Sequence, residues 1–149
     1  MQQVVYVMHF KGHATPGEAS PPTMKVTAKA ASCSITTVIN GGGLTGGFNP
    51  AAAIDALFES EVKLVTASTF TETGTITFGS GGHRLHFASV GEGWMGQSPD
   101  PSLKQGTVTW TVEGGEGQLD GAGGTITSNF TVSETGEVND YHMGVIYLK

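Results

Sequence analysis

Glu72 is the residue whose type and position most clearly favour chemistry. It belongs to the alternating sequence "TFTETGTITF", in which Phe70, Ile76 and Phe78 share its side and threonines occupy the other. Successive side chains of a β-strand point to opposite faces, so an inward-facing set would place this carboxyl group among apolar side chains. Removal from water raises a carboxyl pKa and makes the group a usable acid or base near neutral pH. The alternative is a bulge near Gly74 that exposes Glu72.

Arg84 and His86 form a second pair of possible catalytic residues. Because they are two residues apart on the next predicted strand, they share a face and could hold an anion or an enol oxygen. A pair on the outer surface is the alternative. His83 lies on the opposite face from His86, which is unfavourable for a shared metal. His9 and His142 lie on the first and last predicted strands, which a closed barrel often brings together, but without HExxH or CxxC we expect no metal site.

Aromatic side chains make up the predicted ligand-binding surface. Trp94 and Met95 lie in "GEGWMGQSPDP", interpreted as a loop that covers the mouth of a barrel or is simply anchored there. The other aromatic residues are expected in the wall, where at most they shape a pocket: Phe70, Phe78, Trp110, Phe130 and Tyr141. The single cysteine, Cys33, rules out an internal disulfide and is expected to be a small buried hydrophobe.

The segment "GGEGQLDGAGG", residues 114 to 124, is interpreted as a corner of a sheet. A dinucleotide loop needs a strand before it and a helix after it, so that phosphate meets the helix N-terminus. Here an alternating strand follows, position 120 of the G-x-G-x-x-G spacing is Asp, and GK[ST] is missing. Glycines also suit sharp turns and close backbone packing. We therefore expect no nucleotide at this segment.

The elements that position these residues are predicted to be β-strands at hairpin spacing. Alternation of apolar residues with threonine recurs in four segments, and seven or eight strands in a single domain, residues 1–149, suggest a closed barrel or a sandwich. One short helix is predicted in "NPAAAIDALFES", capped by Asn49 with Pro50 at its first position. The segments "GHATPGEASPP" and "GGGLTGG" are interpreted as loops.

Composition restricts the partners. With 7 Lys and Arg against 13 Asp and Glu, the net charge is −6, and no basic cluster favours nucleic acid. The start "MQQVVYVMHF" has no basic region and only a short apolar run, so we expect neither a signal peptide nor membrane association. One cysteine fits a reducing compartment, and a cytoplasmic location is expected.

The C-terminal third resembles a known barrel family. The strand with Trp110, the corner, and the closing strand "YHMGVIYL" are similar to the allene-oxide-cyclase-like barrels, a superfamily that includes plant dirigent proteins. Their pattern G-x-G-x-[FL]-x-G-A-x-G is approximated by Gly115, Gly117, Leu119, Gly121, Ala122 and Gly124. The resemblance implies an all-β fold: a small antiparallel, calycin-like barrel of about eight strands, often in a homo-oligomer, here a dimer or trimer. It also implies an apolar ligand handled without a cofactor.

Three functions remain open from the sequence. The first is a cofactor-independent isomerase or cyclase that folds an apolar small molecule by shape, while Glu72 or a histidine moves a proton. The second is a binding or carrier barrel with the same pocket and no chemistry. The third is a structural or interaction module whose interior is filled by side chains. The interior distinguishes them: a lone carboxylate beside a roomy cavity favours catalysis, an all-apolar lining favours carriage, and the absence of any cavity favours the third function.

Overall fold

The chain forms a single nine-stranded antiparallel sheet in this computed structural model, which describes residues 1–17 and 22–149. A single turn of 3-10 helix, Gly117–Leu119, accompanies the strands. The strands are β1 (Gln2–Pro16), β2 (Thr23–Asn40), β3 (Gly43–Leu64), β4 (Thr69–Phe78), β5 (His83–Ser89), β6 (Gly93–Gln97), β7 (Leu103–Glu116), β8 (Gly123–Ser133) and β9 (Glu137–Leu148). In the described ranges no helix is long and apolar enough to cross a membrane.

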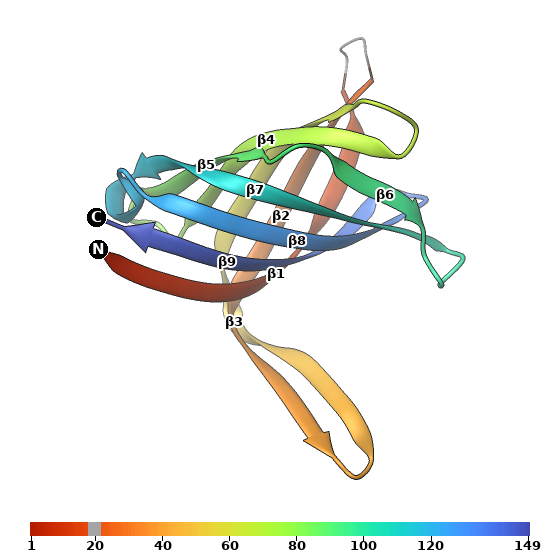
Figure 1. Cartoon of the computed structure of the whole chain (residues 1–149), viewed down its shortest axis with the longest axis horizontal. Helices are drawn as coiled ribbons and strands as arrows, with labels where there is room; N and C mark the ends of the chain where they lie inside the picture. Colours follow the sequence, from red (N-terminus) through yellow and green to blue (C-terminus); the bar gives the residue numbers. More distant parts are fainter. Residues whose placement is uncertain (18–21) are drawn as a thin grey trace.

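The sheet closes on itself as a barrel (Figure 1). Neighbouring strands follow the order β3-β2-β1-β9-β8-β7-β5-β4, and β3 pairs with β4 from Ala56↔Phe78 to Leu64↔Phe70. The short strands β5 and β6 both pair with β4 and β7, so they share one position in the wall. The prediction of an all-β antiparallel barrel with about eight strands is confirmed.

Period-two alternation divides each strand between the interior and the outer wall. The sequence predicted that the phenylalanines of β4 share a face with Glu72 and that the threonines lie on the other; in the structure the face of Glu72 points inward. The middle of the barrel is filled by large side chains that are almost fully buried: Trp110, Phe10, Phe58, Phe87, Ile76, Leu85 and Ile126. Burial of a side chain of this kind stabilises the fold by about 1.5–3 kcal/mol. Among the described residues, the packing leaves a cavity towards one end of the barrel.

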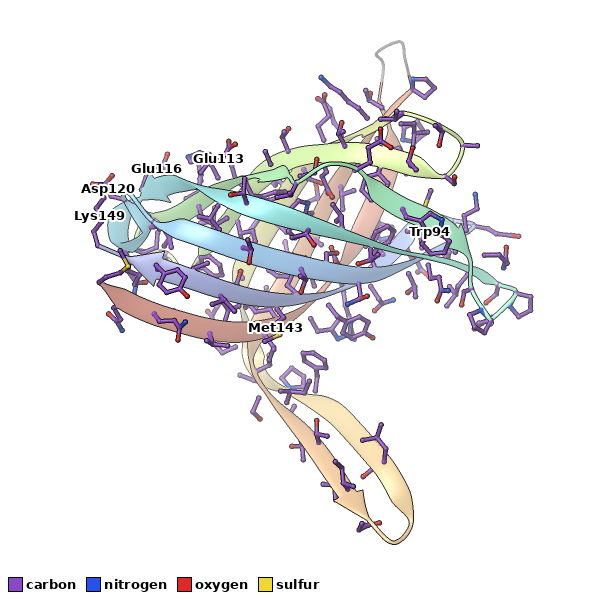
Figure 2. All side chains as sticks on the ribbon, in the orientation of Figure 1. Trp94, Glu113, Glu116, Asp120, Met143 and Lys149 are labelled. Carbon is purple, nitrogen blue, oxygen red and sulfur yellow. The ribbon has the colours of Figure 1, made fainter. Side chains whose placement is uncertain are left out.

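The glycine-rich corner closes the other end. It consists of the 3-10 turn between β7 and β8, from which Leu119 and Ala122 are buried against the interior. Gly117 and Gly121 have φ angles of +65° and +66°, which L side chains rarely adopt. The prediction of a sheet corner is therefore confirmed. Figure 2 shows Asp120 of this corner and Trp94 of β6 near opposite ends of the barrel.

The predicted helix at residues 49–60 is wrong, because this segment belongs to β3. Its C-terminal half alternates inward as a strand, with Ala56 and Phe58 buried in the core. The register between β2 and β3 shifts between the pairs Ala30↔Ala56, Ala31↔Ile54 and Cys33↔Pro50. The three alanines at positions 51 to 53 lie in this irregularity. Pairing with β2 on both sides of the irregularity, at Pro50 and at Ile54, outweighs the helix propensity of the alanines, which is only a weak preference.

The other predicted loops are also partly strands. "GGGLTGG" forms a two-residue turn at Gly41 and Gly42 and then the start of β3, in a hairpin whose register closes at Asn40↔Gly43. This hairpin projects from the barrel as a long arm (Figure 1). "GHATPGEASPP" begins inside β1, which continues to Pro16 because residues 11–16 pair with β2. Positions 18–21 of that predicted connection lie outside the described residues.

Replacement of Gly124 by alanine should destabilise the barrel. Gly124 has a φ of +127°, and an added Cβ would lie 2.3 Å from the carbonyl oxygen of Val145 on the paired strand. Gly123 has no atom within 4 Å of such a Cβ, and its φ is not positive. We expect Gly124→Ala to lower the free energy of unfolding by about 2 kcal/mol or more. The control Gly123→Ala should change it by less than about 0.5 kcal/mol. Thermal unfolding measures both, and equal effects would contradict the strained geometry.

Candidate functional site

A cavity opens at the end of the barrel opposite the glycine-rich corner. It is lined by apolar side chains and two carboxyl groups: Ala14, Met24, Val26, Val62, Leu64, Phe70, Glu72, Met95, Phe130, Val132, Val138 and Asp140. The space open to the centre of a water molecule is about 50 Å³. One water needs about 10–15 Å³ on this measure, so the cavity takes a few water-sized groups. Larger ligands would have to extend into the mouth.

Glu72 is held inside the barrel by two donors from other strands. Ser60 Oγ on β3 donates to Glu72 Oε2 at 2.6 Å, and Trp110 Nε1 on β7 donates to Glu72 Oε1 at 3.2 Å. The backbone N–H of Glu72 donates to Ser89 Oγ at 3.0 Å. Only 6% of the residue is exposed, and Gly74 does not disturb the alternation of the strand. The carboxyl group is therefore buried and oriented.

The environment of Glu72 favours its protonated form. Its pKa is raised from 4.5 to about 8, and burial is the largest cause. The hydrogen bond from Ser60 acts in the opposite direction, the negative charge of Asp140 raises the pKa further, and the hydrogen bond from Trp110 lowers it. At neutral pH most Glu72 side chains thus carry a proton beside an apolar space. This is the property of a general acid poised near the working pH.

Asp140 supplies the second carboxyl group of the cavity from β9. Ser128 Oγ donates to Asp140 Oδ1 at 2.5 Å, and His142 Nε2 lies 2.9 Å from Asp140 Oδ2. The contact with His142 is close but is not aligned as a hydrogen bond. All three side chains are buried, with at most 5% of each residue exposed. They form a polar cluster within an apolar core.

The ring of His142 lies deeper than Asp140 and is surrounded by aromatic side chains. Its centroid is 4.6 Å from that of Phe10, 4.9 Å from Trp110 and 5.3 Å from Phe58. Its Nδ1 has no hydrogen-bond partner among the described residues. Trp110 thus contacts both the ring of His142 and the carboxyl group of Glu72. The indole therefore lies between the hydrogen-bonded carboxyl group of Glu72 and the polar cluster of Ser128, Asp140 and His142.

The arrangement suits proton transfer to and from an apolar ligand. Glu72 can donate a proton, and Asp140 lies in the wall of the same cavity as a second acid or base. The mostly apolar lining lowers the local polarity and so strengthens the electrostatic interactions of these groups. Across the described residues, no cluster of three or more His, Cys, Asp or Glu side chains could hold a metal ion.

Some of the predicted ligand-binding residues reach this site. Phe70 and Phe130 line the cavity. Trp110 lies below it and positions Glu72. Phe78 points into the barrel but packs edge-on against Tyr6, with ring centroids 5.7 Å apart, and does not line the cavity.

The other predicted site residues lie on the outer wall, away from this cavity. Arg84 and His86 do share a face, but it is the outer one, where His86 Nε2 lies 3.0 Å from Glu116 Oε1. Trp94 belongs to the short strand β6 rather than to a loop, and it points outward while the adjacent Met95 lines the cavity. Tyr141 also faces outward. On each of these strands, the residues that point inward are the ones next to the predicted residues in the sequence.

Asp140 and His142 were missed as members of the site. The β1–β9 pairing does bring His9 and His142 to adjacent strands, yet His9 faces outward and His142 inward, so they share no ligand position. On β9 both faces carry apolar residues, and both carry polar ones, Glu137 and Asn139 outside and Asp140 and His142 inside. Alternation alone could not orient such a strand. The sequence did contain one signal for a polar site on this strand: Asp140 and His142 are two residues apart and therefore share a face.

Comparison with solved structures shows which fold this barrel has. No family model matches the chain, and no curated protein matches its sequence. A pterocarpan synthase dirigent protein of known structure is similar over 100% of this chain and 88% of its own, with a TM-score of 0.57 and 12% sequence identity. The fold is dirigent-like. At this identity the similarity concerns the fold alone, and function has to be argued from the site.

The free energy of unfolding should depend on pH because Glu72 is buried. The folded barrel raises its pKa from 4.5 to about 8, so the folded state holds this proton more tightly than the unfolded chain. The resulting stabilisation is complete below about pH 4.5 and is lost as the pH rises to 8, by about 1.4 kcal/mol per pH unit. We expect Glu72→Gln to remove this decline, because glutamine keeps the size without the titration.

Denaturant unfolding between pH 5 and 8 measures the effect. The matched control is Glu61→Gln, the same change at an exposed position of the adjacent strand. It should follow the wild-type curve. Parallel curves for wild type and Glu72→Gln would contradict a raised pKa at Glu72.

Proposed function

We propose that this dirigent-like barrel is a cofactor-independent isomerase or cyclase acting on an apolar small molecule. The observation that carries the proposal is the pair of carboxyl groups, Glu72 and Asp140, in the wall of an otherwise apolar cavity. Proteins gain little stability from such groups, because desolvation costs several kcal/mol unless they are protonated or paired. Their retention in the interior supports a role in proton transfer.

The ligand would bind in the mouth with its reacting end at the carboxyl groups. The present space of about 50 Å³ is smaller than the 300–1,000 Å³ of typical ligand pockets. Two methionines, Met24 and Met95, belong to the lining, and their unbranched side chains change conformation easily. Binding would therefore involve rearrangement of the two methionines, while the wall around Phe70 and Phe130 fixes the conformation of the ligand.

In the proposed reaction the protein moves protons and forms no covalent bond to the ligand. Glu72, protonated at neutral pH, donates its proton to one atom of the substrate, and Asp140 removes a proton from another. The product then has the composition of the substrate, and the two carboxyl groups exchange protons with water to restore the starting state. Ser60 and Trp110 stabilise the carboxylate of Glu72 after it has donated.

A carrier that binds without chemistry is the alternative. The mostly apolar lining and the small number of polar groups in the cavity favour it. The structural neighbour is called a synthase, which supports the catalytic version by analogy only. The two functions share a ligand site and differ in what Glu72 does.

Untargeted mass spectrometry of a small-molecule extract, incubated with the protein and without added cofactors, distinguishes these functions. We expect the wild type to convert a bound compound into an isomer of equal mass with a different retention time. Glu72→Gln should still enrich the substrate but slow conversion at least about 100-fold, the usual contribution of a general acid. The cavity-filling variant Val132→Phe should do neither.

The matched control for the filled cavity is Thr131→Phe, the next residue on the same strand. It faces the outer wall and should behave as the wild type. Enrichment of a compound by wild type and Glu72→Gln alike, with no product, would establish a carrier. Equal enrichment by Val132→Phe would place the ligand outside the barrel and contradict both versions.

A further inference from the structure

A groove lies on the outside of the barrel, where β2 separates from β1. The pairing of these two strands ends at Lys11↔Lys29, and the earlier residues of β1 pair with β9 alone among the described strands. Beyond this row β2 continues with β3 into the arm, residues 33–50, which projects from the barrel (Figure 1). The groove occupies about 900 Å³ between the arm and the wall formed by β1 and β9.

Two lysines at one end of the groove carry positive charges that no acidic group in the groove balances. Lys11 and Lys29 are exposed and lie directly opposite each other on paired strands. Like charges in this arrangement are destabilising. The lining of the groove contains these lysines and His9 but no Asp or Glu. Among the described residues, neither lysine forms an ion pair.

Protection of a sheet edge does not explain this pair of lysines. Exposed lysines often keep an edge strand from pairing with another chain. Here the sheet continues on both sides, since Lys11 pairs with Asn139 of β9 and Lys29 pairs with Leu57 of β3. Glu137 borders the two lysines on the side away from the groove. An anion bound in the groove would offset the repulsion between the two ammonium groups.

Aromatic rings line the groove next to the lysines. His9 stacks on Tyr141 with ring centroids 4.4 Å apart, and Phe48 packs against these two rings at 5.8 and 5.4 Å. A hydrogen bond of 3.0 Å between His9 Nε2 and Asn139 Oδ1 orients the His9 ring. Ile54, which also lines the groove, is 66% exposed. Because aromatic rings pack well in stacked and edge-on contacts, this surface suits a flat aromatic ligand.

We propose that the groove is a binding site for a planar aromatic carboxylate. The carboxylate group lies between Lys11 and Lys29 and accepts charge-assisted hydrogen bonds from their ammonium groups. The rings of the ligand pack against Phe48 and Tyr141. The groove is large enough for such a molecule, since ligand pockets usually measure about 300–1,000 Å³.

This site is separate from the cavity that contains Glu72. The groove and the cavity have no lining residue in common. On β9, Tyr141 lines the groove and the preceding Asp140 lines the cavity, so the wall of the barrel lies between the two sites. Binding in the groove therefore does not depend on the proposed reaction in the interior.

Isothermal titration calorimetry with naphthoate, at neutral pH and low ionic strength, tests the proposal. We expect saturable binding to one site per chain, weakened at least about tenfold in Lys11→Gln and in Lys29→Gln because each loses a charged donor. The matched control is Lys25→Gln, which removes an exposed lysine of the same strand outside the groove and should bind as the wild type does. Val132→Phe, which fills the cavity of the barrel, should also leave binding unchanged.

Two related compounds separate the contribution of the charge from that of the rings. Naphthamide has the same rings without the charge, and decanoate has the carboxylate on a flexible chain. We expect each to bind at least about tenfold more weakly than naphthoate, because each lacks one of the two contacts. Added salt should weaken the binding of naphthoate but not that of naphthamide. Tyr141→Thr should weaken the binding of naphthoate, since it removes a ring from the groove.

Thermal unfolding without ligand gives a second measurement on the lysine variants. Lys11→Gln and Lys29→Gln should unfold at a higher temperature than the wild type at low ionic strength, because each removes the repulsion between the two lysines. A lower unfolding temperature would show that the lysines stabilise the fold and would overturn the proposal. So would a wild type that does not bind naphthoate, equal affinity for naphthamide or decanoate, or lysine variants with unchanged affinity. Loss of naphthoate binding in Val132→Phe would place the compound in the interior and contradict a site in the groove.

Discussion

The pairing of β3 with β4 closes the sheet into a ring, and the geometry of the site depends on this closure. Once the ring is closed, every inward side chain of the strands shares one interior. Trp110, Phe58 and Phe87 pack against one another there, with ring centroids 4.5 to 5.6 Å apart. They fill the middle, and the corner with Leu119 closes one end. A cavity remains towards the other end, where Glu72 and Asp140 lie.

Closure of the ring buries the polar groups, which costs free energy, and it also supplies the hydrogen-bond partners that stabilise them. A buried carboxyl group loses its hydration, and in Glu72 this loss is the main reason for the raised pKa. The ring then supplies partners from strands that are distant in sequence, with Ser60 and Trp110 on Glu72 and Ser128 on Asp140. Each oxygen of Glu72 has one donor, so the protonated group is held in a defined orientation. A general acid needs this combination of retained proton and fixed position.

The strand β9 connects the interior site with the outer surface. Its inward face carries Asp140 and His142, while Tyr141, Met143 and Tyr147 point outward. The outer face also carries the polar Glu137 and Asn139, and the inner face the apolar Val138, Ile146 and Leu148, so both faces are mixed. The polar groups in the interior support the proposed chemistry.

Part of this protein follows from local sequence. The alternation around Glu72 determines which residues share its face, and the glycines of residues 114 to 124 determine a corner, because strand periodicity and positive φ angles are properties of a few consecutive residues. The fold class also follows, since threonine and glycine alternate with apolar residues in segment after segment. These features require no knowledge of distant contacts.

The tertiary structure decided what depends on partners far apart in the chain. Residues 49–60 have a helical composition but form a strand, since β2 provides hydrogen bonds along that segment. Arg84 and His86 share a face, yet only the buried neighbours Leu85 and Phe87 show that this face is the outer one. The orientation of β9 could not be read from its sequence, because both of its faces carry apolar residues. Closure of the ring fixed that orientation and thereby joined Asp140 to the cavity of Glu72.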